Sequence, residues 1–146
     1  RELLARVDVP APAPATGSAY VRLEYRRQME IAVVGVTAVV RLDAGSVSDA
    51  RVAITALAPT IRRVSEAEAA LIGSDGGDEA IAEAARAAAS GSSPITDVRS
   101  SAEYRSAMAN VIARRAIVVA LARARGEHVP IPASAATYAS VGGTST

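Results

Sequence analysis

The sequence predicts an α+β domain in which a three-stranded antiparallel meander is followed by a three-helix bundle packed on it. Two observations lead to this prediction. Up to residue 57 the apolar residues alternate or run continuously, as in strands, and from residue 65 they recur at helical spacing. Thirty-four of the 146 residues are Ala and none is Phe or Trp, so small aliphatic side chains must fill the core. Such a core favours closely packed helices over a deep ligand cavity.

The first ten residues are predicted to form a strand that has no partner within this chain. Residues 3–9 alternate apolar and polar side chains, and Pro10 ends the pattern. Residues 11–17, rich in Pro and Ala, are typical of a stiff extended linker, and the folded domain would then span residues 18–128. Because a lone strand needs a neighbour, we expect residues 1–10 to be the last strand of a missing upstream domain in a longer protein.

Three further strands are predicted after the linker. Residues 20–27 alternate and contain two Tyr, which favours a strand. Residues 31–42 are almost continuously apolar and rich in Val, as in a strand buried on both faces. Residues 43–46 form a turn, and residues 47–57 form the third strand. Short turns between consecutive strands predict an antiparallel meander.

The next segment changes to the period of a helix. A short helix is predicted over residues 65–71, opened by a capping box of Ser65 and Glu68, and an Ala-rich helix follows over residues 78–89. The loop at residues 73–77 contains three Gly but lacks the Lys of a phosphate-binding P-loop. We interpret it as a connection between two helices.

The longest helix is predicted over residues 100–125. A second capping box, Ser100 and Glu103, opens it, and Gly126 follows as its C-terminal stop. Apolar residues on one face recur at helical spacing and are expected in the core. They are Tyr104, Met108, Val111, Ile112, Val119 and Ala122. Residues 129–146, rich in Ser, Gly and Thr, are expected to be a flexible tail.

Composition excludes several classes of function. The chain has no Cys, which excludes disulfides, thiolate catalysis, zinc ribbons and iron–sulphur ligation by its own residues. The single histidine, His128, cannot form a metal site that needs several histidines. A Ser side chain with no base in reach is not activated as a nucleophile. No apolar run is long enough to span a membrane, and a net charge of +1 argues against nucleic-acid binding. We therefore expect no catalytic and no metal-binding residues, and a function in binding, covering or docking.

Two groups of arginines are candidates for binding. Arg22 and Arg26 share one face of the strand over residues 20–27, and with Arg27 they could bind a phosphate, a carboxylate or another subunit; the alternative is a solvated strand edge. Arginines of the last helix could contact nucleic acid, but neighbouring Glu residues and the lack of interleaved aromatics favour an exposed, salt-bridged face. They are Arg114, Arg115, Arg123 and Arg125.

Four groups of short motifs occur in order along the chain. They are Glu2-Leu3-Leu4 with Val7-Asp8-Val9-Pro10; Tyr20-Val21-Arg22-Leu23 with Arg26-Arg27 and Glu30-Ile31-Ala32; Ala53-Ile54 with Ala58-Pro59-Thr60, Arg63 and Glu68; and Ile95-Thr96-Asp97-Val98-Arg99 with Tyr104-Arg105 and Arg114-Arg115-Ala116. In order and spacing they resemble the C-terminal domain of molybdenum-hydroxylase flavoprotein subunits, and most closely the medium subunit of aerobic-type carbon monoxide dehydrogenases. The resemblance covers residues 2 to about 128.

The resemblance implies a function that composition does not reveal. Members of this family carry FAD between an N-terminal FAD-binding region and this C-terminal domain. They work with a molybdopterin-binding large subunit and a small subunit that bears two [2Fe–2S] clusters, as a dimer of heterotrimers. Electrons pass from the clusters to FAD and then to an external acceptor. By this resemblance the chain is part of an oxidoreductase, not catalytic alone, that is cytoplasmic or peripheral at the inner face of the membrane.

The same resemblance assigns three flavin contacts. Leu4 matches an aliphatic residue that packs against the isoalloxazine ring, and a flat apolar ring favours such a face. Arg22 matches a Lys near the flavin and keeps its charge. Ile31 matches a position that is often Tyr in carbon monoxide dehydrogenases; because this sequence has one extra residue between Arg22 and Ile31, the alternative match is Glu30. The alternative from the residues alone is a stand-alone protein-interaction module without cofactor. The sequence identifies neither the substrate nor the electron acceptor.

Overall fold

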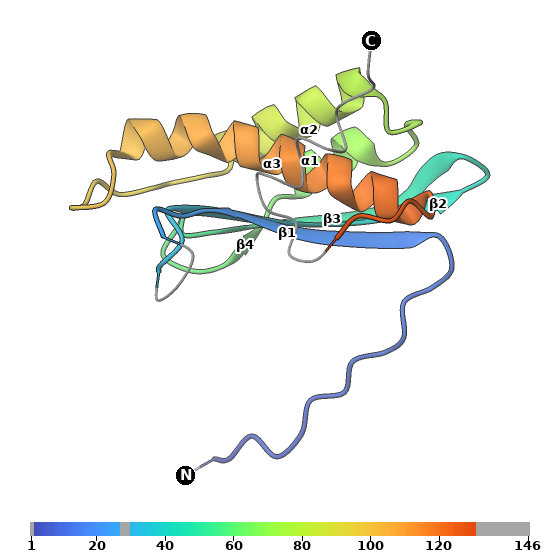
Figure 1. Ribbon diagram of the computed structural model, residues 1–146, viewed down its shortest axis with the longest axis horizontal. Helices are drawn as coiled ribbons and strands as arrows, with labels where there is room; N and C mark the ends of the chain where they lie inside the picture. Colours follow the sequence, from blue (N-terminus) through green and yellow to red (C-terminus); the bar gives the residue numbers. More distant parts are fainter. Residues whose placement is uncertain (1, 27–29, 131–146) are drawn as a thin grey trace.

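The computed structural model describes residues 2–26 and 30–130, and it has two layers, a sheet and three helices that cover one of its faces (Figure 1). The sheet is antiparallel, and its four strands lie in the order in which they occur in the chain. The elements are β1 (Thr16–Leu23), β2 (Val34–Asp43), β3 (Ser46–Thr55), β4 (Arg62–Arg63), α1 (Ser65–Leu71), α2 (Asp78–Ser90) and α3 (Ala102–Ala124). The predicted α+β class and the order of strands before helices are confirmed.

The sheet contains a strand that the sequence did not predict. The two residues of β4 pair with Ala53 and Ile54 of β3, so the predicted three-stranded meander is a four-stranded sheet. A strand of two residues has no alternation that could reveal it. The three longer strands were predicted, but their ends differ by one to four residues.

The core lies between the helices and the face of the sheet that they cover, which we call the inner face. Alternate residues of β2 and β3 point into it and are completely buried. They are Val34, Val36, Ala38, Val40, Val52 and Ile54. No helix within the described part of the chain covers the opposite face, where Thr37 and Val39 are half-buried. The prediction that this strand is buried on both faces is therefore wrong.

The first strand begins earlier and ends earlier than predicted. Because β1 begins at Thr16, the last two residues of the predicted linker belong to the sheet. The strand ends at Leu23, whose carbonyl accepts a hydrogen bond from the Val33 N–H at 2.9 Å and closes the connection to β2. Arg27, at the end of the predicted strand, lies outside the described residues.

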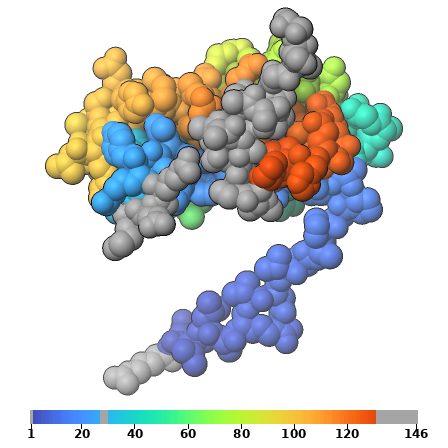
Figure 2. Space-filling model, viewed as in Figure 1, coloured from blue at the N-terminus to red at the C-terminus, as the bar shows by residue number. Residues whose placement is uncertain are grey.

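The segment before β1 lies apart from the rest of the molecule. Residues 2–13 are extended and exposed and form no strand in this structure. Figure 2 shows the segment leaving the body at the start of β1 and running away from it. Its large apolar side chains have no packing partner within the described part of the chain; they are Leu3, Leu4, Val7 and Val9. A partner sheet upstream of residue 1 stays a prediction.

Helix α3 packs closely on β1 and β2 because its inner face is made largely of Ala. Ala109, Ala113, Ala116 and Ala120 are completely buried. Gly17 of β1 lies directly beneath the helix, where an added Cβ atom would be 2.0 Å from the Ala120 carbonyl oxygen. The contact is therefore one of backbone against backbone.

The predicted core face of α3 is only partly correct. Ile112, Val119 and Ala122 are buried as predicted, and Met108 is half-buried. Tyr104 and Val111 are exposed, because the helix turns its Ala-rich side toward the sheet instead.

The two predicted capping boxes do not form. Val64 precedes α1 without any side-chain cap, and Glu68 turns toward the sheet. At α3 the cap is Ser101, one residue later than predicted, and its Oγ accepts a hydrogen bond from the Tyr104 N–H at 3.1 Å. The predicted stop at Gly126 is confirmed, since its φ of +85° is left-handed and suits glycine.

Glu68 joins α1 to the edge of the sheet. It is buried, and its Oε1 accepts hydrogen bonds from the Val52 N–H at 3.0 Å and from Arg63 Nε at 2.9 Å. Its Oε2 accepts a second bond from Arg63 Nη2 at 2.7 Å. Burial raises the pKa of Glu68, but the hydrogen bonds from Arg63 and Val52 and the nearby positive charges outweigh burial and leave that pKa below its usual value.

We expect Glu68→Gln to lower the free energy of unfolding by about 1–3 kcal/mol at pH 7, because the charged hydrogen bonds to Arg63 are lost. Because the pKa of Glu68 is lower in the folded protein than in the unfolded chain, its carboxylate stabilises the fold fully above the unfolded pKa of about 4.3. This stabilisation disappears as pH falls through the pKa of the folded protein. Urea denaturation at pH 7 and near pH 3 should therefore show the variant approaching wild type in acid. The exposed Glu66→Gln is the control, and an equal loss at both pH values would contradict the prediction.

Candidate functional site

The described part of the chain has an apolar pocket of about 360 Å³ at the end of the sheet where β2 begins and β3 ends. Its walls come from four segments that are distant in sequence. They are Ile31 and Ala32 before β2, Ala56, Ala58 and Pro59 after β3, Ser93, Pro94 and Ile95 after α2, and Asp97, Arg99 and Arg105 around the start of α3. The pocket is therefore mainly apolar, with one polar end formed by a carboxylate and two guanidinium groups.

Arg105 is the residue that holds these segments together. Only 4% of it is exposed, although it is charged. Its Nη1 donates to the Val33 carbonyl oxygen at 2.8 Å, next to the start of β2, and its Nη2 donates to Asp97 Oδ1 at 2.6 Å. Nε is buried and makes no hydrogen bond. Because one rigid guanidinium joins β2 to the loop before α3, it fixes the shape of the polar end of the pocket.

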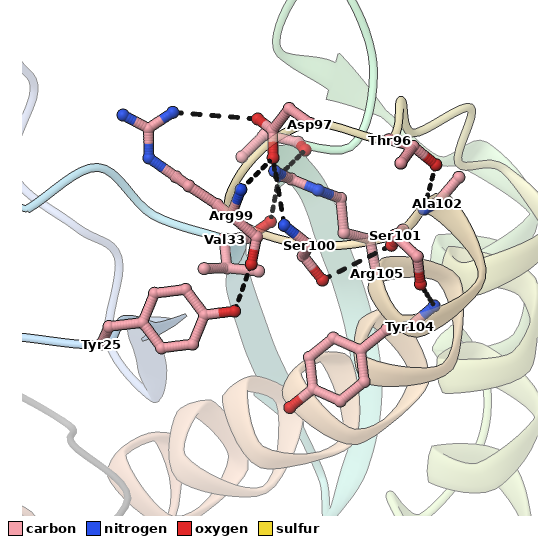
Figure 3. Close-up of polar contacts among 11 residues, drawn as sticks. Tyr25, Val33, Thr96, Asp97, Arg99, Ser100, Ser101, Ala102, Tyr104 and Arg105 are labelled. Atoms are coloured by element: carbon pink, nitrogen blue, oxygen red, sulfur yellow. Dashed lines mark hydrogen bonds and ion pairs between the residues drawn. The ribbon is translucent and has the colours of Figure 1, made fainter.

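Asp97 organises the loop before α3 (Figure 3). Its Oδ1 accepts hydrogen bonds from the Arg99 N–H at 2.9 Å, from the Ser100 N–H at 3.1 Å and from Arg105. The bond from the Arg99 N–H and then that from Arg105 hold the pKa of Asp97 below its usual value. This carboxylate lies just before α3, and its partners are the loop itself and Arg105.

The three predicted flavin contacts lie in different places. Ile31 is 61% exposed and lines the pocket. Arg22 lies at the same end of the sheet, where it pairs with Gly35 of β2, and its Nη2 is 2.5 Å from Glu24 Oε2. Leu4 is 82% exposed on the extended N-terminal segment, and it does not line the pocket. The structure thus brings Ile31 and Arg22 to one end of the molecule and leaves Leu4 outside it.

The other candidate arginines that the structure describes have partners within the domain. Arg26 is within 3.2 Å of Glu30, and Arg114 within 2.9 Å of Asp78. Arg123 donates to the carbonyl oxygen of Ser18 at 2.6 Å and to those of two residues after α3. The ion pair of Arg114 agrees with the predicted salt-bridged face, whereas Arg123 bonds main-chain oxygens instead. Arg115 also has a partner.

The Gly-rich loop at residues 73–77 connects α1 and α2, as predicted. Two of its N–H groups bond within the loop, from Gly76 to Ser74 Oγ and from Gly77 to Asp75 Oδ1, and the Gly73 N–H bonds to the Val47 carbonyl oxygen. They are thus already engaged without a phosphate. Among residues 2–26 and 30–130 there is no cluster of side chains able to hold a metal ion. Within the same residues no helix is both long and apolar enough to cross a membrane.

Sequence reasoning missed Arg105 as part of the site. The available signal was its place on the helix, because it shares a face with Ala109, Ile112 and Ala116 at helical spacing. A charged residue on a buried face needs a charged or polar partner. Its partner Asp97 is eight residues earlier, outside the helix, and no helical period connects the two.

Comparison with known proteins gives consistent matches. Residues 19–120 match the family model of the CO dehydrogenase flavoprotein C-terminal domain. The carbon monoxide dehydrogenase medium chain of Hydrogenophaga pseudoflava is 37% identical over 122 residues, which are 84% of this chain and 42% of that protein. The 6-hydroxypseudooxynicotine dehydrogenase complex subunit alpha of Paenarthrobacter nicotinovorans is 36% identical over 125 residues, 85% of this chain and 42% of that protein. The chain thus spans about two fifths of the length of these relatives.

Solved structures show the same fold. A carbon monoxide dehydrogenase from Hydrogenophaga pseudoflava that lacks the Mo-pyranopterin moiety of its molybdenum cofactor matches with a TM-score of 0.75 and 42% identity, over 79% of this chain and 40% of that chain. Quinoline 2-oxidoreductase from Pseudomonas putida 86 matches with a TM-score of 0.70 and 27% identity, over 79% of this chain and 39% of that chain.

Proposed function

This chain belongs to the family of CO dehydrogenase flavoprotein C-terminal domains, and on that premise we propose that it is part of the FAD-carrying electron-transfer subunit of a molybdenum hydroxylase. The domain covers the flavin and docks the partner subunits, a molybdopterin-binding large subunit and a small subunit with [2Fe–2S] clusters, in a dimer of heterotrimers. The complex is cytoplasmic or peripheral at the inner face of the membrane. The observation that supports the proposal most directly is the exposed Ile31 on an apolar pocket, at the end of the sheet that also carries Arg22.

The residues at this end of the sheet fit one part of FAD. Ile31, Ala32 and Pro59 offer an apolar surface to a flat ring, and Arg22 places a positive charge at the same end. A pocket of about 360 Å³ accommodates an edge of the ring system but not a whole dinucleotide. The N–H groups of Gly73, Gly76 and Gly77 in the loop at residues 73–77 are engaged within the domain. We therefore place the region that holds the phosphates of FAD upstream of residue 1.

The chemistry of electron transfer belongs to the cofactor, since bound FAD takes electrons from the iron–sulphur clusters and passes them to an external acceptor. The residues of this chain supply position and charge. Ile31 and its neighbours keep water from one side of the ring. The positive charge of Arg22 would stabilise the reduced form of the ring, which carries negative charge. Leu4 would reach the ring only where the N-terminal segment folds back with the upstream region.

We expect Arg22→Ala to lower the midpoint potential of the flavin in the purified complex by about 10–20 mV, which corresponds to about 0.5–1 kcal/mol for a partly exposed charge and a two-electron couple. The loss of Arg22 also leaves the Glu24 carboxylate without its ion pair, which shifts the potential in the same direction. Arg22→Lys should stay near wild type. Arg41→Ala, at the opposite end of β2, is the matched control. An unchanged potential in Arg22→Ala would count against the role of Arg22.

The proposed function as a whole is tested by native mass spectrometry of the material that purifies with this chain. We expect a large subunit, an iron–sulphur subunit and FAD in the same assembly. An isolated chain of 14.9 kDa that joins no other subunit, even when the subunits are produced together, would favour the stand-alone interaction module instead.

A further inference from the structure

We propose that the loop formed by residues 94–101, which we call the docking loop, is a preformed attachment point for another subunit of the complex. Its apolar tip enters an apolar socket on that subunit, and Arg99 pairs with a carboxylate beside the socket. The inference rests on the proposed function, because it takes the partner to be a subunit of the same enzyme. Relatives of this chain are named as chains or subunits of complexes.

The first argument is the exposure of the tip. Val98 is fully exposed and Ile95 is 70% exposed. In Figure 1 the loop projects beyond the end of the helices, away from the rest of the body. Tyr25 and Ile31, which are also exposed, belong to the same end of the molecule, since Tyr25 bonds the loop and Ile31 shares the pocket with it. Grouped apolar side chains of this kind on a soluble domain mark an interaction surface.

The second argument is that the docking loop is held rigidly in this exposed shape. Asp97 and Ser100 exchange two main-chain hydrogen bonds, at 3.0 and 3.3 Å, which close the loop into a tight turn around Val98 and Arg99. Thr96 Oγ1 accepts from the Ala102 N–H at 3.0 Å, and the Tyr25 hydroxyl donates to the Arg99 carbonyl oxygen.

Arg105 then anchors the turn to the core through Asp97. A loop built only to connect α2 with α3 has no need of this bracing, and folding alone does not favour a Val held in water. Bracing of this kind removes the cost of ordering the loop when a partner binds.

The third argument is the charge at the tip. Asp97 is engaged mainly by Arg105, at 2.6 Å, whereas the Arg99 guanidinium is 3.8 Å from its other oxygen. Two arginines thus share one carboxylate, and Arg99, which is partly exposed, retains positive charge toward the outside. A carboxylate on the partner complements this charge and fixes the orientation of docking.

Cysteine labelling can test the position of the loop because the chain has no native Cys. Val98→Cys is reacted with a maleimide in the isolated flavoprotein subunit, with its upstream region, and in the assembled enzyme, and labelling at residue 98 is followed by mass spectrometry. We expect the reaction at residue 98 to slow at least tenfold on assembly. The matched control is Ile72→Cys, because Ile72 is 49% exposed and lies at the opposite end of the sheet, where the adjacent Gly73 bonds to Val47 at the start of β3. Its labelling rate should not change.

Two further variants test the chemistry of docking. Val98→Asp and Arg99→Glu should each weaken retention of a partner subunit at least tenfold, with the circular dichroism and urea midpoint of the isolated chain unchanged. Ile72→Asp should retain every subunit. An assembled enzyme carrying Val98→Cys in which residue 98 still reacts at the isolated rate overturns the docking loop alone. Loss of FAD with all subunits retained also overturns it, since the loop would then serve the flavin. A wild-type chain that joins no complex overturns the proposed function and the docking loop with it.

Discussion

Replacing Gly17 by Ala is expected to destabilise the domain by about 3 kcal/mol or more, at the upper end of the cost of inserting atoms into a packed interior. The added Cβ would lie 2.0 Å from the Ala120 carbonyl oxygen and 2.4 Å from the Ala124 nitrogen. Both atoms belong to the backbone of α3, so no side chain can rotate to make room. The strand and the helix would have to separate, and the contacts of α3 with β1 would weaken along their whole length.

Urea denaturation of the isolated chain measures this effect directly. Ser18→Ala is the neighbouring control, because the Ser18 side chain is exposed and only its carbonyl oxygen takes part in a contact, with Arg123. That variant should stay within about 0.5 kcal/mol of wild type. A Gly17→Ala protein as stable as the Ser18→Ala protein would show that α3 does not pack as closely on β1 as described.

Replacing Arg105 by Ala is the second change with a large expected effect, about 3–5 kcal/mol. The variant leaves the Val33 carbonyl oxygen without its donor and Asp97 without its closest positive charge. Arg105→Lys should recover only part of the loss, because one ammonium cannot reproduce a guanidinium that donates in two directions at once. Arg99→Ala is the control, since its side chain is partly exposed and 3.8 Å from Asp97.

The pH dependence of unfolding gives an independent check on this pair. The pKa of Asp97 is lowered in the folded protein, so its stabilising effect is complete above the unfolded pKa of about 3.9 and disappears as pH falls through the folded value. Without Arg105 the pKa of Asp97 should return toward its usual value. The difference in stability between wild type and Arg105→Ala should therefore shrink below about pH 4. A difference that stays constant down to pH 2 would contradict the assignment of Asp97 as the partner.

The sequence predicted the elements of the fold better than their ends. The apolar run of β2 and the helical spacing of apolar residues in α3 each involve many residues, so single exceptions do not hide them. The end of a helix or strand depends on single contacts, and the spacing of apolar residues does not reveal these contacts. Ser65 and Glu68 have the spacing of a capping box, yet Glu68 instead bonds Val52 of β3 and Arg63 of β4. The hydrogen bond from Val52, sixteen residues earlier in the chain, therefore takes the place of a local capping bond at the start of α1.

The candidate site was predictable only in part, for a similar reason. Ile31 and Arg22 came from motif resemblance, and the structure places both at one end of the sheet, while their contact with FAD remains a prediction. Arg105 was not predicted because its role depends on Val33, 72 residues earlier in sequence. Only the packing of α3 against the sheet shows that the two meet.

That separation has a consequence for the order of folding. The contact between Arg105 and Val33 spans 72 residues, so it can form only after β2 has joined the sheet and α3 has settled on it. The turn at residues 97–100 depends on the same guanidinium for its anchor, and it therefore reaches its final shape late. A half-folded chain would not yet display that turn. If that turn docks another subunit as proposed, assembly would then select molecules whose core is already complete.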